Sequence, residues 1–219
     1  MRLKKPLAEI VAAIRAATPA WFGQENDRLV QGLIDSGAAD GALRADDHIP
    51  DFLLPNAEGQ LVSSTQLLAN GPLVLSFYRG MWCPYCSQEL NALADATPRL
   101  KEAGATVAAI TPEIGGVALK TKRERDLQFE ILCDVDNGVA MEFGLMFRIP
   151  EDIQKSYLKF NVNMPKIYGN DGWMIPIPAT YVVDHDGTIV FAYVNPDYRE
   201  RCDPESLVDI VARLQPVIS

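Results

Sequence analysis

A strand pattern that leads directly into two closely spaced cysteines is the feature that most limits what this chain can fold into. Residues 73–78 form an almost wholly apolar run of strand length, and Cys83-Pro84-Tyr85-Cys86 follows it. After the cysteines, apolar side chains recur at helical spacing, at Leu90, Leu93 and Leu100. Periodicities of this kind distinguish buried strands from amphipathic helices. The sequence therefore predicts a strand–turn–helix unit in which both cysteines lie at the start of the helix.

Further strands and helices alternate on either side of this unit. Before it we expect a β-hairpin of residues 52–54 and 61–62 and a short helix that Ser63 or Ser64 caps. After it come expected strands at 105–110 and 130–133, a charged helix at 117–126, a hairpin at 180–184 and 188–193, and a helix from about 204 to 214. Strands that alternate with helices are typical of an α/β fold. We predict a mostly parallel sheet flanked by helices.

The first 45 residues show a different pattern. Apolar residues follow helical spacing in two segments that Thr18-Pro19 separates: Leu3, Leu7, Ile10, Val11 and Ile14, and then Leu29, Val30, Leu33 and Ile34. We predict a helical hairpin here, ended by Ser36-Gly37 and Asp40-Gly41, with 42–50 as a linker. The expected organisation is a helical extension over 1–45 and one domain over 46–219.

Charge and hydropathy exclude several classes of partner. With 20 basic and 29 acidic residues the net charge is −9, which disfavours binding to nucleic acid or to an anionic membrane. The longest uncharged stretch, residues 59–78, contains too many polar residues to span a membrane. Glu9 and Arg15 interrupt any signal-peptide pattern at the start. We expect a cytoplasmic protein.

The cysteine pair carries the chemistry. A helix N-terminus stabilises an anion and lowers the pKa of a thiol placed there. Two intervening residues allow the sulfurs to cycle between dithiol and disulfide, and Trp82 and Pro84 restrict the turn. A structural zinc site would need a second ligand pair, which the remaining candidates, Cys133, Cys202, His48 and His185, do not provide. We expect redox chemistry with no metal and no other cofactor.

Three segments resemble a known family. Residues 49–55, 77–90 and 181–187 are similar to the alkyl hydroperoxide reductase/thiol-specific antioxidant (AhpC/TSA) branch of the thioredoxin-fold superfamily. The similarity extends over about residues 49–214 and is greatest to bacterial peroxiredoxin-like proteins that carry a helical extension and a Cys-x-x-Cys motif. It implies a thioredoxin-like, peroxiredoxin-type fold and thiol-dependent peroxide reduction.

The resemblance assigns roles to individual positions. Cys86 stands where peroxiredoxins have their peroxide-attacking cysteine, and Glu89 follows it by three residues as in many relatives. Cys83 replaces the family's threonine and Arg79 its proline. The family's distant arginine falls at Pro178. This proline instead resembles the cis-proline of thioredoxins, with Pro176 as the other candidate nearby, and we expect Arg79, or else Arg148, to replace the missing arginine.

Three interpretations of the function of the cysteine pair remain open. We favour attack of Cys86 on hydrogen peroxide or an organic hydroperoxide, followed by a Cys83–Cys86 disulfide that thioredoxin or a small thiol reduces. In the alternative, a more exposed Cys83 attacks a protein disulfide, as in thioredoxin. The third reading is a redox sensor or binding module without turnover. A homodimer is left open.

Residues outside the motif carry weaker expectations. The segment 144–177 is apolar and irregular, and we expect it to cover the cysteine pair or a subunit interface. Cys133 is expected to pack in the core, and Cys202 to face solvent as a bystander. His48 and His185 are expected at the surface. In the oxidised protein only Cys83 and Cys86 should be joined.

Overall fold

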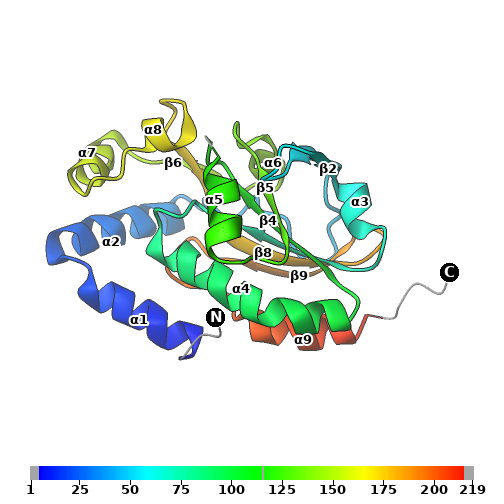
Figure 1. Cartoon of the computed structure of the whole chain (residues 1–219). Helices are drawn as coiled ribbons and strands as arrows, with labels where there is room; N and C mark the ends of the chain where they lie inside the picture. Colours follow the sequence, from blue (N-terminus) through cyan, green and yellow to red (C-terminus); the bar gives the residue numbers. More distant parts are fainter. Residues whose placement is uncertain (1–4, 115, 215–219) are drawn as a thin grey trace.

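The computed structural model describes residues 5–114 and 116–214 and has a five-stranded sheet at its centre (Figure 1). Residues 1–4 of the expected helical extension, Leu3 among them, and residues 215–219 of the expected domain lie outside the described residues. The strands of the sheet are β3 (Leu73–Phe77), β4 (Thr106–Thr111), β5 (Glu130–Cys133), β8 (Ala179–Val183) and β9 (Ile189–Val194), in the order β5-β4-β3-β8-β9. This is the α/β architecture that the sequence predicted.

The sheet is more mixed than expected. β3 pairs in parallel with β4, and β4 with β5, whereas β8 is antiparallel to both β3 and β9. The expectation of a mostly parallel sheet is thus correct for one half only. The tight turn before β9 accounts for the antiparallel pairing of β8 with β9, because such a turn can only join neighbouring strands antiparallel.

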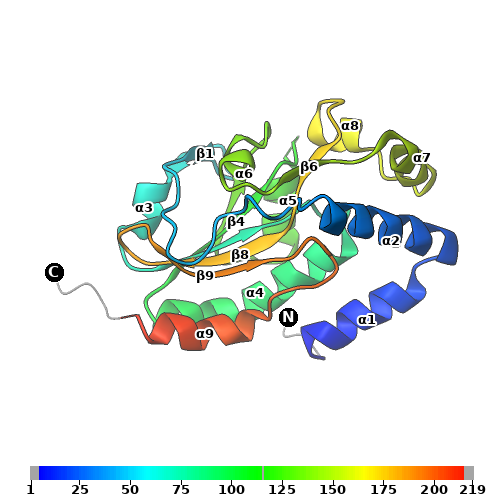
Figure 2. The ribbon, with the colours of Figure 1, turned by 180° about the vertical axis from the view of Figure 1, so that it is seen from behind.

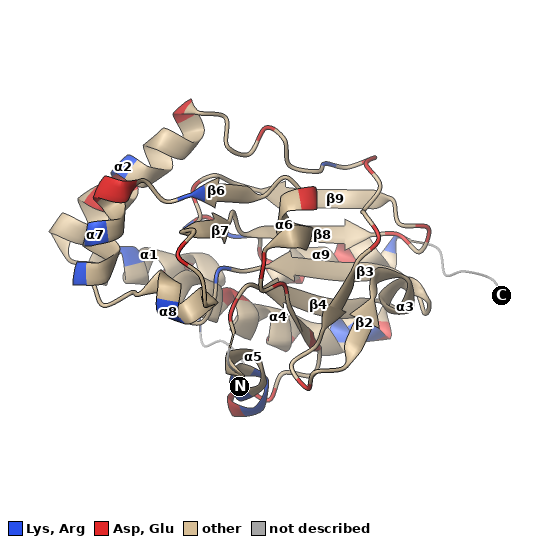
Figure 3. Cartoon of the chain, turned by 90° about the horizontal axis from the view of Figure 1, so that it is seen from above, with Lys and Arg blue, Asp and Glu red and all other residues tan. Residues whose placement is uncertain are grey.

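Side chains alternate between the two faces of the sheet and build two cores. Val74, Ala109 and Val182 belong to one core, while Leu75, Ile110 and Tyr181 belong to the other. Figure 3 shows that charged residues gather on helices and loops and leave the central strands almost uncharged. Uncharged strands are what a sheet covered on both faces requires.

Helices cover both faces of the sheet. α4 (Pro84–Glu102) and α9 (Pro204–Ala212) pack against each other on one face, and α5 (Val117–Glu124) packs by β5 (Figure 1). The other core includes residues of the β-hairpin β1 (Leu53–Pro55) and β2 (Leu61–Ser63), of α3 (Ser64–Leu68) and of α6 (Gly138–Glu142). Ser63 forms the predicted cap of α3, with Gln66 closing a capping box.

The N-terminal helices are α1 (Leu7–Ala17) and α2 (Ala20–Asp35), and they separate at Pro19 as predicted. They diverge instead of lying side by side (Figure 2). α1 packs against α4, and α2 against α7 (Glu151–Lys159). The predicted hairpin is therefore wrong in its packing, because each helix buries its apolar face on the rest of the molecule.

The segment 144–177 is more regular than expected. It contains α7, α8 (Met164–Tyr168) and a small hairpin of β6 (Met146–Arg148) and β7 (Met174–Pro176). Its buried side chains, among them Tyr157 and Tyr168, join the core that contains both cysteines. The expectation that this segment covers the cysteine pair is confirmed by the contacts described below.

Candidate active site

The cysteine pair lies where the carboxyl end of β3 meets the first turn of α4. Cys83 is the N-cap of α4, Pro84 opens the helix, and Cys86 lies in the first turn. Proline fits the first helical position because that position needs no N–H partner. The sequence-predicted strand–turn–helix unit is therefore confirmed, and the Cys83 sulfur lies at the positive end of the helix dipole.

Each sulfur has its own buried arginine. Arg79 donates a hydrogen bond from Nη2 to the Sγ of Cys83 over 3.1 Å, and Arg201 donates from Nη2 to the Sγ of Cys86 over 3.3 Å. Arg79 was the arginine that the sequence put forward. Arg201 was missed, because an arginine in a loop 115 residues further along the chain carries no local signal. Two cations around two thiols favour a negatively charged sulfur.

The charge is distributed unequally over the pair. Burial raises the pKa of Cys83, but the hydrogen bond from Cys86 and the charges of Arg79 and Arg201 outweigh it, so that this pKa lies well below that of an ordinary thiol. Burial and the hydrogen bond to Cys83 raise the pKa of Cys86 well above the ordinary value. These opposite shifts favour the negative charge on Cys83 over Cys86.

Glu89 holds Arg201 in place. Its carboxylate forms a fully buried ion pair with Arg201 and accepts a hydrogen bond from Thr180 Oγ1 over 3.3 Å. Burial raises the pKa of Glu89, and Arg201 and Thr180 act against that rise. α4 thus supplies both the sulfurs and the carboxylate that fixes the arginine beside one of them.

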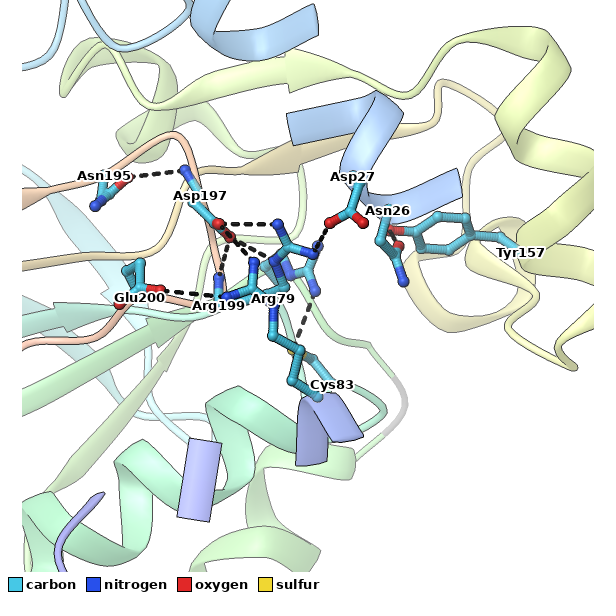
Figure 4. A network of polar contacts seen from close by, with 10 residues as sticks. Asn26, Asp27, Arg79, Cys83, Tyr157, Asn195, Asp197, Arg199 and Glu200 are labelled. Carbon is cyan, nitrogen blue, oxygen red and sulfur yellow. Dashed lines mark hydrogen bonds and ion pairs between the residues drawn. The ribbon is translucent and has the colours of Figure 1, made fainter. Parts of the chain in front are cut away.

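The loop that carries Arg201 is anchored to the N-terminal helices. Arg199 donates to Asp27 of α2 over 2.5 Å and to Asp197 within the loop over 2.7 Å. Arg15 of α1 adds a contact of 3.4 Å to Asp197. Figure 4 shows this network beside Arg79 and Cys83. The N-terminal helices therefore help to form the surroundings of the site.

The site is closed to solvent. Cys83 and Cys86 are both 0% exposed. Trp82 donates from Nε1 to the hydroxyl of Tyr168 over 3.0 Å, and that hydroxyl also hydrogen-bonds the carbonyl oxygen of Arg79, so α8 is tied to the cysteine loop. The expectation that Cys83 is the more exposed sulfur is therefore wrong.

Glu113 is a second buried acid that the sequence did not reveal. It follows β4 and accepts a hydrogen bond at Oε1 from the backbone N–H of Met81 over 3.0 Å. Its Oε2 has no hydrogen-bond partner among the described residues. Burial raises its pKa to about 7, against the opposing effect of the Met81 hydrogen bond. An acid with this pKa titrates in the physiological range.

The other residues that the sequence put forward either lie away from the cysteine pair or differ from expectation. Pro178 is buried just before β8, and no peptide bond of the described residues is cis, so the cis-proline prediction is wrong for Pro176 and Pro178 alike. Arg148 is exposed and bonds to Gly172 instead of a thiol. Cys202 is buried, not solvent-facing, because it lies under α9 beside Ser206.

The other predicted positions are as follows. Cys133 is partly buried at the end of β5, and His48 and His185 are exposed. Over residues 5–114 and 116–214, no three cysteine, histidine or acidic side chains are grouped as metal ligands. The same residues include no helix with the length and hydropathy needed to cross a membrane.

Comparisons with known proteins agree with this geometry. The chain is similar to the chloroplast peroxiredoxin Q of Oryza sativa subsp. japonica, with 28% identity over 193 residues, 88% of this chain and 73% of the rice protein. It is also similar to the thiol-disulfide oxidoreductase ResA of Bacillus anthracis, with 24% identity over 154 residues, 70% of this chain and 72% of that protein.

The fold and the family are shown independently. The structure resembles peroxidoxin BcpB from Mycobacterium tuberculosis with a TM-score of 0.60 and 21% identity, over 78% of this chain and 94% of that one. The model of the AhpC/TSA family matches residues 45–192, which is more than half of the chain. The protein belongs to the AhpC/TSA family.

Proposed function

We propose that this protein is a thiol-dependent peroxidase that reduces hydrogen peroxide or organic hydroperoxides through a Cys83/Cys86 dithiol–disulfide cycle. One observation carries the proposal: the two cysteine sulfurs are buried, and each accepts a hydrogen bond from its own arginine, Cys83 from Arg79 and Cys86 from Arg201. A thiolate is the nucleophile in thiol oxidation, and exclusion of water protects its reactive intermediate. The similarity to a peroxiredoxin supports the same activity.

We propose that the cycle begins at Cys83. Its thiolate attacks one oxygen of the peroxide, the O–O bond breaks, and the leaving alkoxide or hydroxide takes a proton from water, which leaves a sulfenic acid on Cys83. This order reverses the one expected from the position of Cys86 in the motif. The reasons are the position of Cys83 at the N-cap of α4 and its hydrogen bond from Arg79, and the lowered pKa of Cys83 and raised pKa of Cys86 agree with them.

The second step follows from the loss of the first charge. Once Cys83 is a neutral sulfenic acid, it no longer raises the pKa of Cys86, and Arg201 favours the Cys86 thiolate. This thiolate attacks the Cys83 sulfur, a disulfide forms, and the departing hydroxide becomes water. A thiol reductant then restores both thiols, and burial of the pair favours a small thiol over thioredoxin.

The same burial argues against the alternative substrate. A protein disulfide must bring its own backbone close to the attacking sulfur, and the Trp82–Tyr168 contact covers the loop that carries Cys83. The similarity to ResA and the low pKa of Cys83 favour a thiol–disulfide oxidoreductase, so the alternative is tested in the same experiment.

The test compares two activities of one preparation. We expect steady-state consumption of hydrogen peroxide and tert-butyl hydroperoxide with a thiol reductant, and no reduction of insulin disulfides above background. Oxidation that stops after one equivalent would indicate a sensor, and insulin reduction without peroxide turnover would indicate the oxidoreductase. The molar mass of the same sample in solution tests the homodimer.

A further inference from the structure

Arg79 is held by aromatic rings, whereas Arg201 is held by the Glu89 carboxylate. The guanidinium carbon of Arg79 lies 3.5 Å from the ring centre of Tyr198 and 4.8 Å from that of Trp82. A cation within about 6 Å of a ring centre is attracted by the ring, and more strongly where water is excluded. Arg79 and Tyr198 are only 2% and 3% exposed. The Tyr198 ring therefore helps to hold the buried charge of Arg79.

Two further tyrosines contact this pair. The hydroxyl of Tyr157, in α7, donates to Asn26 Oδ1 of α2 over 3.4 Å. Burial raises the pKa of Tyr157, while the charge of Arg79 and hydrogen bonds with Arg79 and Tyr198 oppose that rise. Tyr85, in the first turn of α4, meets Tyr198 edge-on, with the ring centres 5.9 Å apart. Residues of α2, α4 and α7 thus surround the contact between the guanidinium and the Tyr198 ring.

The two residues that flank Tyr198 fasten its loop to the N-terminal helices. Arg199, 5% exposed, donates to Asp27 of α2 over 2.5 Å and to Asp197 over 2.7 Å. Arg15 of α1 lies 3.4 Å from Asp197. Figure 4 shows the network between α2 and this loop. The position of the Tyr198 ring therefore depends on α1 and α2.

From these contacts we infer that Tyr198 is a positioning residue for the Cys83 thiolate, and that α1 and α2 act on the dithiol through it. The loop that these helices fasten keeps the ring on Arg79, and the ring keeps Arg79 Nη2 within 3.1 Å of the Cys83 sulfur. Without the ring Arg79 gains other rotamers, so the thiolate loses part of the charge and the hydrogen bond that stabilise it. The inference rests on the proposed function and gives the N-terminal helices a part in it.

Two substitutions separate the ring of Tyr198 from its hydroxyl. The ultraviolet absorbance of the thiolate is measured in the reduced full chain between about pH 4 and pH 8, below the pKa of tyrosine, and Cys83→Ser identifies the step that belongs to Cys83. We expect Tyr198→Leu to raise that midpoint by about one pH unit, a ten-fold smaller ionisation constant, as fits the loss of a buried cation–π contact. Tyr198→Phe keeps the ring and should keep the wild-type midpoint. An unmoved midpoint in Tyr198→Leu would overturn the inference.

Tyr181→Leu is the matched control for the loss of a buried ring. Tyr181 is 0% exposed but belongs to the other core, which does not contain the cysteines. It therefore loses the same bulk without a change at Arg79, and we expect the wild-type midpoint for Cys83. A shift as large as that of Tyr198→Leu would show that the midpoint follows general loosening of the fold, and would refute the inference.

A surface variant tests α2 without touching the buried rings. The Asp27 side chain is 64% exposed, so Asp27→Asn leaves the core intact and removes its ion pair with Arg199. Loss of a negative charge by itself lowers the pKa of a nearby thiol, whereas a loosened loop raises it. We expect the ionisation constant of Cys83 to fall about two-fold to three-fold, in keeping with an exposed ion pair. Asp152→Asn, which removes a 3.0 Å ion pair with Arg28 of α2, should not lower it. No fall in Asp27→Asn would contradict the role of α2.

Peroxide consumption by the same proteins separates the inference from the proposed function. Besides Arg79, the charged and titratable groups that face Cys83 are Arg201, Cys86 and Glu113, and none of them is altered in these variants. Shifted midpoints without peroxide consumption by the wild type would refute the proposed function and leave the inference intact. Peroxide consumption by the wild type with unmoved midpoints in the variants would refute the inference alone.

Discussion

At the scale of single residues, we propose that the charge on the dithiol decides which sulfur reacts first. Cys83 has the N-cap position, the Arg79 hydrogen bond and the lowered pKa, whereas the pKa of Cys86 is raised. We expect Cys86→Ser to form one sulfenic acid at Cys83 with one equivalent of peroxide, and to lose rapid recycling. Cys83→Ser should be unreactive on the same time scale.

Stopped-flow oxidation followed by sulfenic-acid trapping measures both variants. A reactive Cys83→Ser beside an inert Cys86→Ser would restore the order predicted from the motif. In that case Arg201, at 3.3 Å from Cys86, would take the part of the family's missing arginine.

Glu113 makes stability depend on pH. Its folded-state pKa of about 7 lies above that of an exposed carboxyl, so its stabilising contribution is complete at pH values below about 4.5 and is lost as the pH rises through 7. The shift corresponds to about 3 kcal/mol. We expect Glu113→Gln to be more stable than the wild type at pH 8 and to show a smaller change between pH 5 and pH 8.

Urea unfolding at the two pH values provides the measurement. Other titrating groups contribute equally to both proteins, so their effect cancels in the difference between the free energies of unfolding of the variant and the wild type. An identical pH dependence in both proteins would show that Glu113 is ionised in the folded state with an ordinary pKa.

Removing one partner of the buried ion pair of Arg201 and Glu89 should destabilise the protein strongly, whereas replacing both partners with apolar residues should destabilise it little. Arg201→Met leaves a buried carboxylate without its cation, which destabilises a protein by about 3 kcal/mol or more. The double variant with Glu89→Leu should recover most of this loss, because no charge then stays buried. Free energies of unfolding at pH 8 test it, and a double variant no more stable than the single one would contradict the argument.

At the scale of elements, the loop after α2 and the start of the segment 144–177 form a tight backbone contact, besides the packing of α2 on α7. Gly144 has a φ of +68°, and a Cβ placed there would lie 2.0 Å from the carbonyl oxygen of Gly41. Leu43 donates its backbone N–H to Phe143 just beside this contact. We propose residues 1–45 as an extension that is fastened to the domain here.

A glycine substitution tests that contact. We expect Gly144→Ala to destabilise the protein by about 3 kcal/mol, since backbone strain and overpacking add. The control is Gly59→Ala, with a φ of +83° and no atom within 4 Å of the added carbon, which should cost only about 1 kcal/mol. Thermal or urea unfolding gives both values, and equal costs would refute the close approach.

At the scale of the whole molecule, four cysteines occupy different surroundings. Cys83 accepts a hydrogen bond from Arg79 and Cys86 accepts one from Arg201, whereas Cys202 contacts Ser206 and Cys133 ends β5. Burial raises the pKa of Cys202 to about 12 and also raises that of Cys133, so both stay protonated thiols. Peroxide treatment should therefore yield one disulfide, Cys83–Cys86, and two alkylatable thiols.

Peptide mass mapping after alkylation checks this pattern in the full chain. A Cys86–Cys202 link would contradict it and would require the α9 end of the molecule to move. The Cys83→Ser variant is the control, because it should contain no intramolecular disulfide at all.

The sequence by itself determined the local features of this protein. The apolar run before the cysteines gave β3, the two-residue spacing put both sulfurs on the first turn of α4, and the turn residues gave the β8–β9 hairpin. Each depends on neighbours in the chain, which is why periodicity and turn chemistry suffice. Arg79 could be found in the same way because it lies four residues from Cys83.

Only the tertiary structure decided which charges surround the cysteine pair and which elements cover it. Arg201 reaches Cys86 and Glu113 reaches the backbone of Met81 from loops distant in sequence, and Tyr168 of α8 covers the cysteine loop. The packing of α1 and α2 on the domain, instead of on each other, likewise depends on surfaces that exist only after folding. The pKa of a thiol follows from burial and from charges in space, and a linear pattern does not record which charges will meet.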